Sequence, residues 1–157
     1  KLYGLKAVGL RYFSVYGPWG RPDMAPMLFA NAISKGEPIK VFNNGNLSRD
    51  FTYIDDIING ITALIEQFDT INLTDKKYKI YNIGNNTPVK LLDFIQAVEG
   101  ACNKKAQLDF YPMQDGDVYQ TFADIEDLKA VTGYIPKVKI NEGIQEFVNW
   151  YKAYFKK

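Results

Sequence analysis

The sequence predicts an α/β fold in which short strands alternate with helices along the chain. Short runs rich in β-branched and aromatic residues alternate with longer segments whose apolar residues recur at helical spacing. Glycine, proline and asparagine stand between the two kinds of segment. The 157 residues are 46% hydrophobic and 15% aromatic, which suffices for one domain with a core.

Strands are predicted at five places. Residues 6–15 carry apolar side chains at both odd and even positions, which is typical of a strand buried on both faces. The other four strands are shorter and are expected at 39–42, 48–53, 78–83 and 107–111. Asn43, Asn44 and Gly45 predict a turn after the first of these four.

Five helices are predicted between the strands, and residues with capping preferences mark their ends. Gly36 and Gly133 suit the position just after a helix, where the backbone is left-handed. Pro26 suits a first turn, and Thr87 with Pro88 suits an N-cap followed by the first helical residue. The helices are expected at 26–35, from Asp55 or Asp56 to 68, at 88–102, between Asp124 and Gly133, and from Asn141 to 155, and a polar loop is expected at 69–77.

The composition excludes several classes of site. The sequence has no histidine, so Ser-His-Asp triads, Cys-His pairs and histidine-bound zinc are excluded within this chain. Its single cysteine, Cys102, permits no internal disulfide. Nineteen basic and 18 acidic residues give a net charge of +1 without a long basic run, which argues against nucleic-acid and membrane-surface binding. No apolar run approaches 18 residues and no signal peptide is visible, so we expect no membrane span and a reducing, cytoplasmic setting.

A loop rich in glycine and proline follows the first predicted strand. Residues 14–23 read SVYGPWGRPD, and ligands of open α/β sheets bind beyond the carboxyl ends of strands. Arg21 in this loop offers a planar fork of donors that suits a carboxylate or a phosphate. The alternative is a solvated arginine in an ordinary turn, which residue types alone favour.

Two further motifs carry charged residues at conspicuous places. Arg49 lies in a short apolar strand, where burial of its charge requires an anion. That anion is either the neighbouring Asp50 or a phosphate of a bound nucleotide. Asp115 and Asp117 flank Gly116, and they either bind hydroxyls or a cation or form a plain turn. Because the spacing is not that of an EF-hand, we expect no metal site.

Four segments, taken in order, resemble one protein family. Residues 10–24 (LRYFSVYGPWGRPDM), 49–57 (RDFTYIDDI), 81–84 (YNIG) and 113–118 (MQDGDV) are similar to the extended short-chain dehydrogenases/reductases that include nucleotide-sugar epimerases and dehydratases. The run YGPWGRPDM is most similar to the UDP-glucuronate 4-epimerase branch of this family. The resemblance extends over the whole chain.

The resemblance implies that residues 1–157 are the C-terminal, substrate-binding portion of an NAD(P)-binding Rossmann-type enzyme. This portion would contain the last sheet strands and a small mixed α/β domain. The sequence has no Gly-x-Gly-x-x-Gly, and none of its 11 tyrosines is followed four residues later by lysine. In the family both features lie earlier, so we expect the NAD-binding half and the Tyr-Lys pair upstream of Lys1. The chain alone is expected to be inactive and to bury an exposed sheet face by self-association or rearrangement.

The resemblance also implies roles for individual residues. The implied contacts are Tyr12, Phe13 and Val15 beside the nicotinamide; Ser14 at the sugar or a phosphate; Arg21 at the sugar carboxylate; Lys40, Val41 and Phe42 at the uracil, partly through backbone groups; Arg49 at the diphosphate; and Asp117 near the ribose. Gln114 stands where other epimerases carry a second phosphate-binding arginine, and Asp115 stands where similar chains often carry proline. The first departure sets this chain apart from UDP-galactose epimerases, and the second adds negative charge near the diphosphate.

The activity implied by the resemblance is an NAD-dependent 4-epimerisation of UDP-glucuronate, an isomerase reaction. Its 4-keto intermediate is a β-keto acid, which loses CO₂ most easily when the bond to the carboxylate is perpendicular to the keto plane. Arg21, with Ser14 nearby, is expected to hold the carboxylate away from that geometry. The alternatives are part of a UDP-glucuronate decarboxylase or of a nucleotide-sugar 4,6-dehydratase, or a non-catalytic module that binds a nucleotide sugar.

Overall fold

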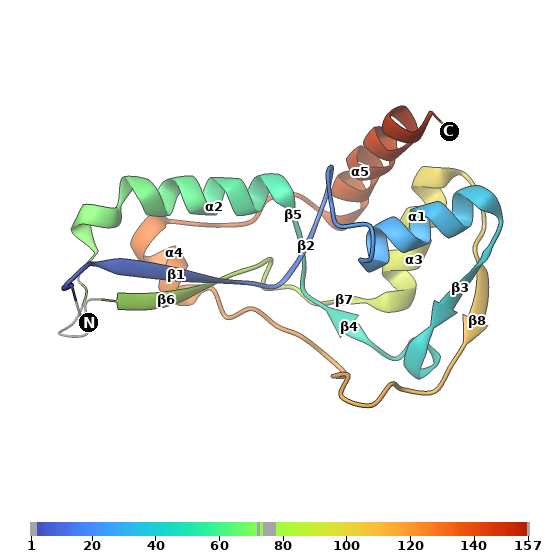
Figure 1. Ribbon diagram of the computed structural model, residues 1–157, viewed down its shortest axis with the longest axis horizontal. Helices are drawn as coiled ribbons and strands as arrows, with labels where there is room; N and C mark the ends of the chain where they lie inside the picture. Colours follow the sequence, from blue (N-terminus) through green and yellow to red (C-terminus); the bar gives the residue numbers. More distant parts are fainter. Residues whose placement is uncertain (1–2, 72, 74–77, 157) are drawn as a thin grey trace.

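The computed structural model of the chain describes residues 3–71, 73 and 78–156. Two lobes lie side by side, joined by short central strands (Figure 1). The strands are β1 (Ala7–Tyr12), β2 (Ser14–Tyr16), β3 (Pro38–Val41), β4 (Ser48–Arg49), β5 (Phe51–Tyr53), β6 (Tyr78–Ile83), β7 (Val89–Lys90) and β8 (Gln107–Phe110). The helices are α1 (Ala25–Lys35), α2 (Ile54–Glu66), α3 (Leu91–Cys102), α4 (Glu126–Thr132) and α5 (Ile140–Phe155), with 3₁₀ turns η1 (Phe42–Gly45) and η2 (Phe68–Thr70).

The strands form pairs that confirm the predicted α/β class. Strands β1 and β6, β2 and β5, and β3 and β8 pair in parallel, whereas β4 and β7 pair antiparallel. Each parallel pair needs a crossover, and helices occupy all three of these connections. Of the predicted loop 69–77, residues 72 and 74–77 lie outside the described residues.

The predicted strand 6–15 is divided in two. The N–H of Phe13 donates to the carbonyl of Ile83 (3.4 Å), and the N–H of Ser14 donates to the carbonyl of Asp50 (3.1 Å). The chain therefore changes its partner strand between these two residues. The smaller lobe contains β1, β6, α2 and α4, and the larger lobe contains α1, α3, α5, β3 and β8 (Figure 1). The switch carries Ser14 and the following loop away from the smaller lobe and toward the junction of the two lobes.

The prediction that this strand is buried on both faces is wrong for β1. Tyr12 is 50% exposed, and Val8 and Leu10 are only partly buried. Within the described part of the chain β1 pairs with β6 alone, and the apolar cluster of this lobe comes from α2, α4 and β6 on one face. The opposite face of β1 and β6 has no covering layer among the described residues (Figure 1).

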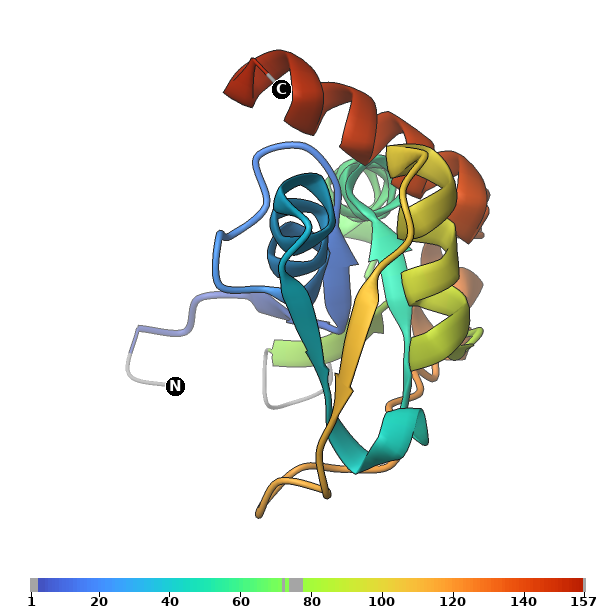
Figure 2. The same cartoon turned by 90° about the vertical axis from the view of Figure 1, so that its right-hand side faces the viewer.

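The larger lobe has its own core beneath α1, α3 and α5. The rings of Phe51 and Phe94 stack at 4.0 Å, and Tyr16 meets both rings edge-on. Figure 2 shows α1 and α3 beside β3 and β8, with α5 above them. The core therefore holds the end of β2, the start of α1 and β5 in fixed relation.

Two predicted helix ends are confirmed. Gly36 follows α1 with φ 73°, and its N–H donates to helix carbonyls. Gly133 follows α4 with φ 70°. Both residues have the left-handed backbone that glycine adopts without steric strain.

Three predicted helix starts are displaced. Helix α2 begins at Ile54, one residue before the expected aspartates, and α5 begins at Ile140 rather than at Asn141. Helix α3 begins at Leu91 because residues 89–90 pair with residues 48–49 as a strand, so Thr87 is not its N-cap. The pairing of β7 with β4 overrides the local Thr-Pro signal.

Asp56, in the first turn of α2, has a tertiary role. Its carboxylate accepts hydrogen bonds from the N–H groups of Lys137 (3.0 Å) and Val138 (2.9 Å). The aspartate is buried, so attraction to the helix dipole is only part of its role. It ties the segment that leads into α5 to the start of α2.

None of the helices in the described residues is long and apolar enough to cross a membrane.

Candidate functional site

A cavity of about 540 Å³ opens between α1, β2, β3 and β5. Much of its wall is apolar, with Met24, Leu28 and Phe29 from the start of α1 and Phe51 from β5. A cavity of this size and character is typical of sites for small organic ligands.

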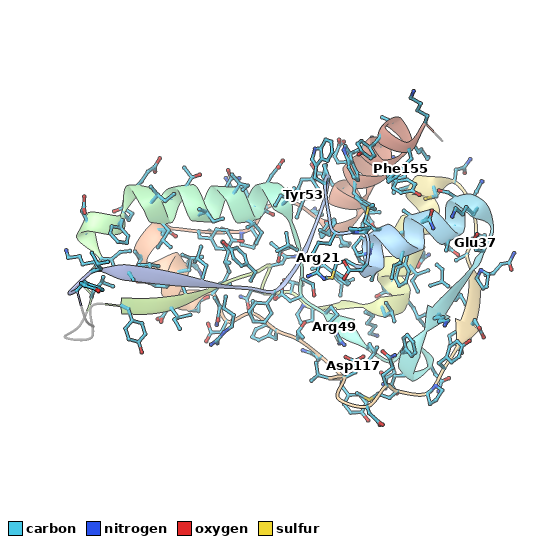
Figure 3. All side chains as sticks on the ribbon, in the orientation of Figure 1. Arg21, Glu37, Arg49, Tyr53, Asp117 and Phe155 are labelled. Carbon is cyan, nitrogen blue, oxygen red and sulfur yellow. The ribbon has the colours of Figure 1, made fainter. Side chains whose placement is uncertain are left out.

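Polar and charged residues of several elements converge on the same cavity. Ser14 of β2, Lys40 of β3 and Arg49 of β4 line it, together with Asn31 within α1 and Glu37 just after this helix. Arg49 lies at the junction of the lobes, whereas Glu37 lies near the far end of α1 (Figure 3). Lys40 and Arg49 are the groups of this wall that could contact an anionic ligand.

Arg49 is paired with Asp117, 68 residues later in the chain. Its Nη2 donates to Asp117 Oδ1 at 2.5 Å, and its Nη1 donates to the carbonyls of Ser48 (2.9 Å) and Tyr119 (3.5 Å). The side chains of Arg49 and Asp117 are 20% and 27% exposed, so the pair is partly shielded from solvent. The sequence-based alternative that Asp50 neutralises Arg49 is therefore wrong.

Asp50 points into the protein instead and forms a junction between segments. Its carboxylate accepts hydrogen bonds from the N–H groups of Asn85 (2.7 Å), Asn86 (3.0 Å) and Ala123 (2.9 Å) and from the hydroxyl of Thr52 (3.3 Å). The side chain is fully buried. Backbone N–H donors stabilise the buried carboxylate in place of a cation.

This junction organises the wall of the cavity. The backbone carbonyl of Asp50 accepts a hydrogen bond from the N–H of Ser14, and the backbone N–H of Asp50 donates to Thr121 Oγ1 at 3.1 Å. The segment of Thr121 continues back to Asp117, the partner of Arg49. Asp50 thus connects the three chain segments that carry Ser14, Arg49 and Asp117. The sequence analysis did not predict this structural role of Asp50, although a carboxylate inside an apolar strand could have indicated it.

Arg21 lies outside the cavity wall. Its Nε donates to Asp23 Oδ1 (3.1 Å) and its Nη2 to Asp23 Oδ2 (2.5 Å), in a fork that grips both oxygens. This hydrogen bond raises the pKa of Arg21 and lowers the pKa of Asp23. The Arg21 side chain is 74% exposed. Arg21 therefore stands at the junction of the lobes with its donors turned to its own loop (Figure 3).

The residues of β3 and Phe42, the first residue of η1, contribute to both the core and the cavity. Val41 is fully buried in the core, and its carbonyl accepts the N–H of Tyr111 at 2.9 Å, so its side chain does not face the cavity. Phe42 and Lys40 do line the cavity. The ring of Phe42 lies 5.7 Å from that of Tyr111, and Lys40 Nζ lies 5.7 Å from the centroid of the same ring.

Tyr111 was not singled out from the sequence, yet it contacts both Phe42 and Lys40, and these three residues are called the aromatic corner. Its hydroxyl donates to Asp109 Oδ2 at 2.7 Å, and this hydrogen bond raises the pKa of Tyr111. The alternation in residues 107–111 could have indicated that its ring shares a strand edge with Lys40 and Phe42.

Of the remaining predicted residues, Val15 is in the site and the others lie around it. Tyr12 is half-exposed at the carboxyl end of β1, and Phe13 packs against the core of the smaller lobe. Val15 lines the cavity. Gln114 is exposed, and its carbonyl accepts the N–H of Asp117 (3.2 Å) in a turn where Gly116 has φ 82°. Of the predicted set, the cavity brings together Ser14, Val15, Lys40, Phe42 and Arg49.

No group of three or more Cys, Asp or Glu residues in the described ranges is arranged to hold a metal ion. The turn at 115–117 places one carboxylate, Asp117, on Arg49 and leaves Asp115 exposed.

Comparisons with known proteins agree with the architecture. The model of the protein family described as "NAD dependent epimerase/dehydratase family" matches residues 1–84. An uncharacterised protein of Methanocaldococcus jannaschii is 50% identical over 96% of this chain and 44% of its own length. A Rhizobium meliloti protein named probable UDP-glucuronate 4-epimerase is 39% identical over 99% of this chain and 49% of its own.

A solved structure shares the fold. It is the UDP-glucuronic acid 4-epimerase of Bacillus cereus in complex with UDP-glucuronic acid and NAD, with a TM-score of 0.80 and 34% identity. The match covers 92% of this chain and 45% of that one. The chain spans about half the length of the curated relatives it matches. With more than half of its residues inside the family match, the chain belongs to the NAD dependent epimerase/dehydratase family.

Proposed function

We propose that the chain is the C-terminal, substrate-binding portion of an NAD-dependent UDP-glucuronate 4-epimerase and that its cavity binds the UDP-sugar. The observation that carries this proposal is the convergence of Ser14, Lys40, Phe42 and Arg49 on one cavity of about 540 Å³. The names of the relatives support the same substrate.

Arg49 would bind the diphosphate. Its guanidinium is fixed by Asp117 and by two backbone carbonyls before any ligand arrives. A planar, preoriented guanidinium suits phosphate oxygens, and its partly shielded position strengthens the attraction. Asp117, held beside it, would be free to share its second oxygen with a ribose hydroxyl.

The aromatic corner would receive the base. Phe42 lines the cavity, and Tyr111 and Lys40 support it from the side. A flat aromatic ring beside exposed backbone polar groups suits a nucleobase. The ring can stack on the face of the base, while the backbone groups form hydrogen bonds with the edge of the base. Val41 would contribute through its backbone alone, since its side chain is buried in the core.

The sugar carboxylate would be held by Arg21 with Ser14. Ser14 lies on the cavity wall, and Arg21 follows in the same loop with an exposed fork. To bind the carboxylate, the guanidinium must turn from Asp23 or share its donors. Loss of CO₂ from the 4-keto intermediate requires the C–C bond to the carboxylate to be perpendicular to the keto plane. Holding the carboxylate near that plane would therefore suppress decarboxylation.

NAD would supply the hydride acceptor and donor at C4 of the sugar. The residues described here fit only one end of this cofactor: Tyr12, Phe13 and Val15 lie at the strand ends where a nicotinamide would rest. The sequence has no Gly-x-Gly-x-x-Gly turn for the pyrophosphate. The rest of the cofactor site, with the Tyr-Lys pair, would come from the half by which the relatives are longer.

The open face of β1 and β6 would be the surface on which that half packs. Tyr78 and Ile80 are about half-exposed there, on the side of β6 opposite to the buried Tyr81 and Ile83. In the isolated chain these side chains and the free edge of β1 favour self-association. Sedimentation at increasing concentration should therefore show a mass above that of the 17.9 kDa monomer.

Calorimetric titration of the chain with UDP and UDP-glucuronate tests the proposed site. Arg49→Ala should weaken UDP binding by roughly tenfold to a hundredfold, because one charge-assisted contact is lost and Asp117 is left unpaired. Arg11→Ala is the matched control, since Arg11 lies on β1 outside the cavity wall. Equal UDP affinities for the two variants, or no UDP binding by the unaltered chain, would contradict the proposal.

The reaction itself is tested by product analysis. The chain alone, given NAD and UDP-glucuronate, should show no turnover. A protein of the relatives' length that contains this sequence should yield an isomer of unchanged mass. Release of CO₂ would indicate a decarboxylase instead, and loss of water a dehydratase.

A further inference from the structure

A cluster of aromatic rings joins the loop after β2 to helix α5. The ring of Trp19 lies 5.4 Å from that of Trp150 and 5.0 Å from that of Tyr154, and the latter two stack at 5.4 Å. These three residues are called the aromatic clasp. In both ribbon views the loop after β2 rises toward α5 (Figures 1 and 2).

The backbone at the clasp is held in an unfavourable conformation. Trp19 has φ 63°, a left-handed value that a bulky L-residue adopts only when its surroundings impose it. Gly17 also has positive φ, 141°, and a Cβ there would lie 2.6 Å from Ile54 Cγ2, so this end of the loop sits tightly on α2. The loop is thus anchored at Gly17 by close backbone packing and at Trp19 by ring contacts.

Burial does not explain Trp19, because its side chain is 73% exposed. Its contacts are with rings of α5 and not with the core clusters of either lobe. What they restrain is the short stretch that carries Arg21. In that stretch the N–H of Gly20 donates to the carbonyl of Gly17 (3.3 Å), and the N–H of Met24 donates to that of Arg21 (3.2 Å).

We propose that Trp19 is a positioning residue: through the aromatic clasp, α5 fixes the loop so that Arg21 is presented to the carboxylate of the sugar. The inference rests on the proposed function, since it assigns Arg21 to that carboxylate. It gives α5, which does not line the cavity, a part in selecting the substrate. A loop without the clasp would lose orientation, and Arg21 would spend less time in reach of the ligand.

The test compares Trp19→Ala with Trp19→Phe, which keeps an aromatic ring. Tyr3→Ala is the control, because Tyr3 is an exposed aromatic residue that precedes β1 and takes no part in the clasp. Amide exchange of Gly20 and Met24 is measured by NMR without ligand. We expect exchange about tenfold faster in Trp19→Ala, because the loop opens more often when the ring contacts are lost. Exchange should be near normal in Trp19→Phe and unchanged in Tyr3→Ala. Unchanged exchange in Trp19→Ala would overturn the proposal.

The second readout is the affinity ratio of UDP-glucuronate to UDP-glucose, which differ at the carboxylate. Trp19→Ala should lower this ratio about tenfold, the order expected when one charge-assisted hydrogen bond is lost, and Trp19→Phe should restore most of it. The sequence contains two tryptophans, Trp19 and Trp150, and both belong to the clasp, so fluorescence excited selectively at tryptophan rather than at the 11 tyrosines reports on it. Its emission should change with UDP-glucuronate more than with UDP-glucose.

The two levels of the argument fail differently. An unaltered chain that binds both sugars equally would contradict the assignment of Arg21 in the proposed function, whatever the exchange data show. A clear preference that survives in Trp19→Ala would overturn the positioning role of Trp19 and leave the proposed function standing.

Discussion

Replacing Asp50 by asparagine tests whether the buried carboxylate holds the wall of the cavity together. The carboxylate has four hydrogen-bond donors around it, of which three are backbone N–H groups. Asparagine has one acceptor oxygen and one NH₂ group in the same volume. In its best orientation the oxygen stays with Asn86 and Ala123, and the NH₂ group faces the N–H of Asn85.

The expected loss follows from this count. One buried N–H left without an acceptor costs about 1–3 kcal/mol, and the two retained bonds weaken because they are no longer charge-assisted. Removal of a buried charge offsets part of this loss. We therefore expect Asp50→Asn to lower the free energy of unfolding by about 2–3 kcal/mol, a large share of a typical domain's stability. For a chain of 157 residues this corresponds to a fall in Tm of roughly 4–12 °C.

Urea unfolding followed by circular dichroism measures this difference, with Asp115→Asn as the control. Asp115 is exposed in the 115–117 turn, so its substitution changes net charge equally without touching a buried network. The control should stay within about 0.5 kcal/mol of the unaltered chain. A stability of Asp50→Asn equal to that of the control would refute the account of Asp50 as a junction.

Three further predictions concern tyrosines and the Arg21 loop. The Tyr16 hydroxyl is buried without a hydrogen-bond partner among the described residues, whereas Tyr134 donates to the carbonyl of Gly84 at 3.0 Å. Thermal unfolding should therefore show Tyr16→Phe neutral or stabilised and Tyr134→Phe destabilised by about 1 kcal/mol, and the reverse order would contradict the assignment. Burial raises the pKa of both tyrosines, so the folded state favours their protonated form, and stability should be constant below about pH 10 and fall above it. In unfolding measured from pH 8 to 11, the double Phe variant should lose much of this dependence, and an unchanged slope would rule out these groups. Asp23→Asn frees the Arg21 fork from a weak, solvent-exposed ion pair, so calorimetry should show UDP-glucuronate affinity raised by up to about fivefold, and weaker binding would show that Asp23 assists Arg21.

Local patterns predicted the class of fold and many element positions. Helices α1 and α4 end where Gly36 and Gly133 allow a left-handed residue, which depends on the backbone of one residue. Strands β6 and β8 follow from short runs of β-forming residues. The family resemblance is carried by contiguous motifs such as 14–23 and 49–57, which are equally local, and the comparison with known proteins confirmed it.

The partner of Arg49 shows where local reasoning ends. Asp50 is its neighbour in sequence, but alternate residues of an extended strand point to opposite sides, so the carboxylate faces away from the guanidinium. The true partner, Asp117, comes from a segment that runs back from β8 along the junction of the lobes (Figure 1). Only the folded chain brings the two groups within 2.5 Å.

By itself, the sequence determined the alternation of strands and helices, the ends of α1 and α4, the absence of histidine chemistry and the family. Each of these depends on residue type or on spacing within one segment. The tertiary structure decided the switch of partner strand between Phe13 and Ser14, the replacement of a helix cap at Thr87 by strand β7, the burial of Asp50 and the clasp of Trp19 on α5. These features join residues that are far apart in the chain, and their stability comes from burial and hydrogen bonds that exist only after those segments have met.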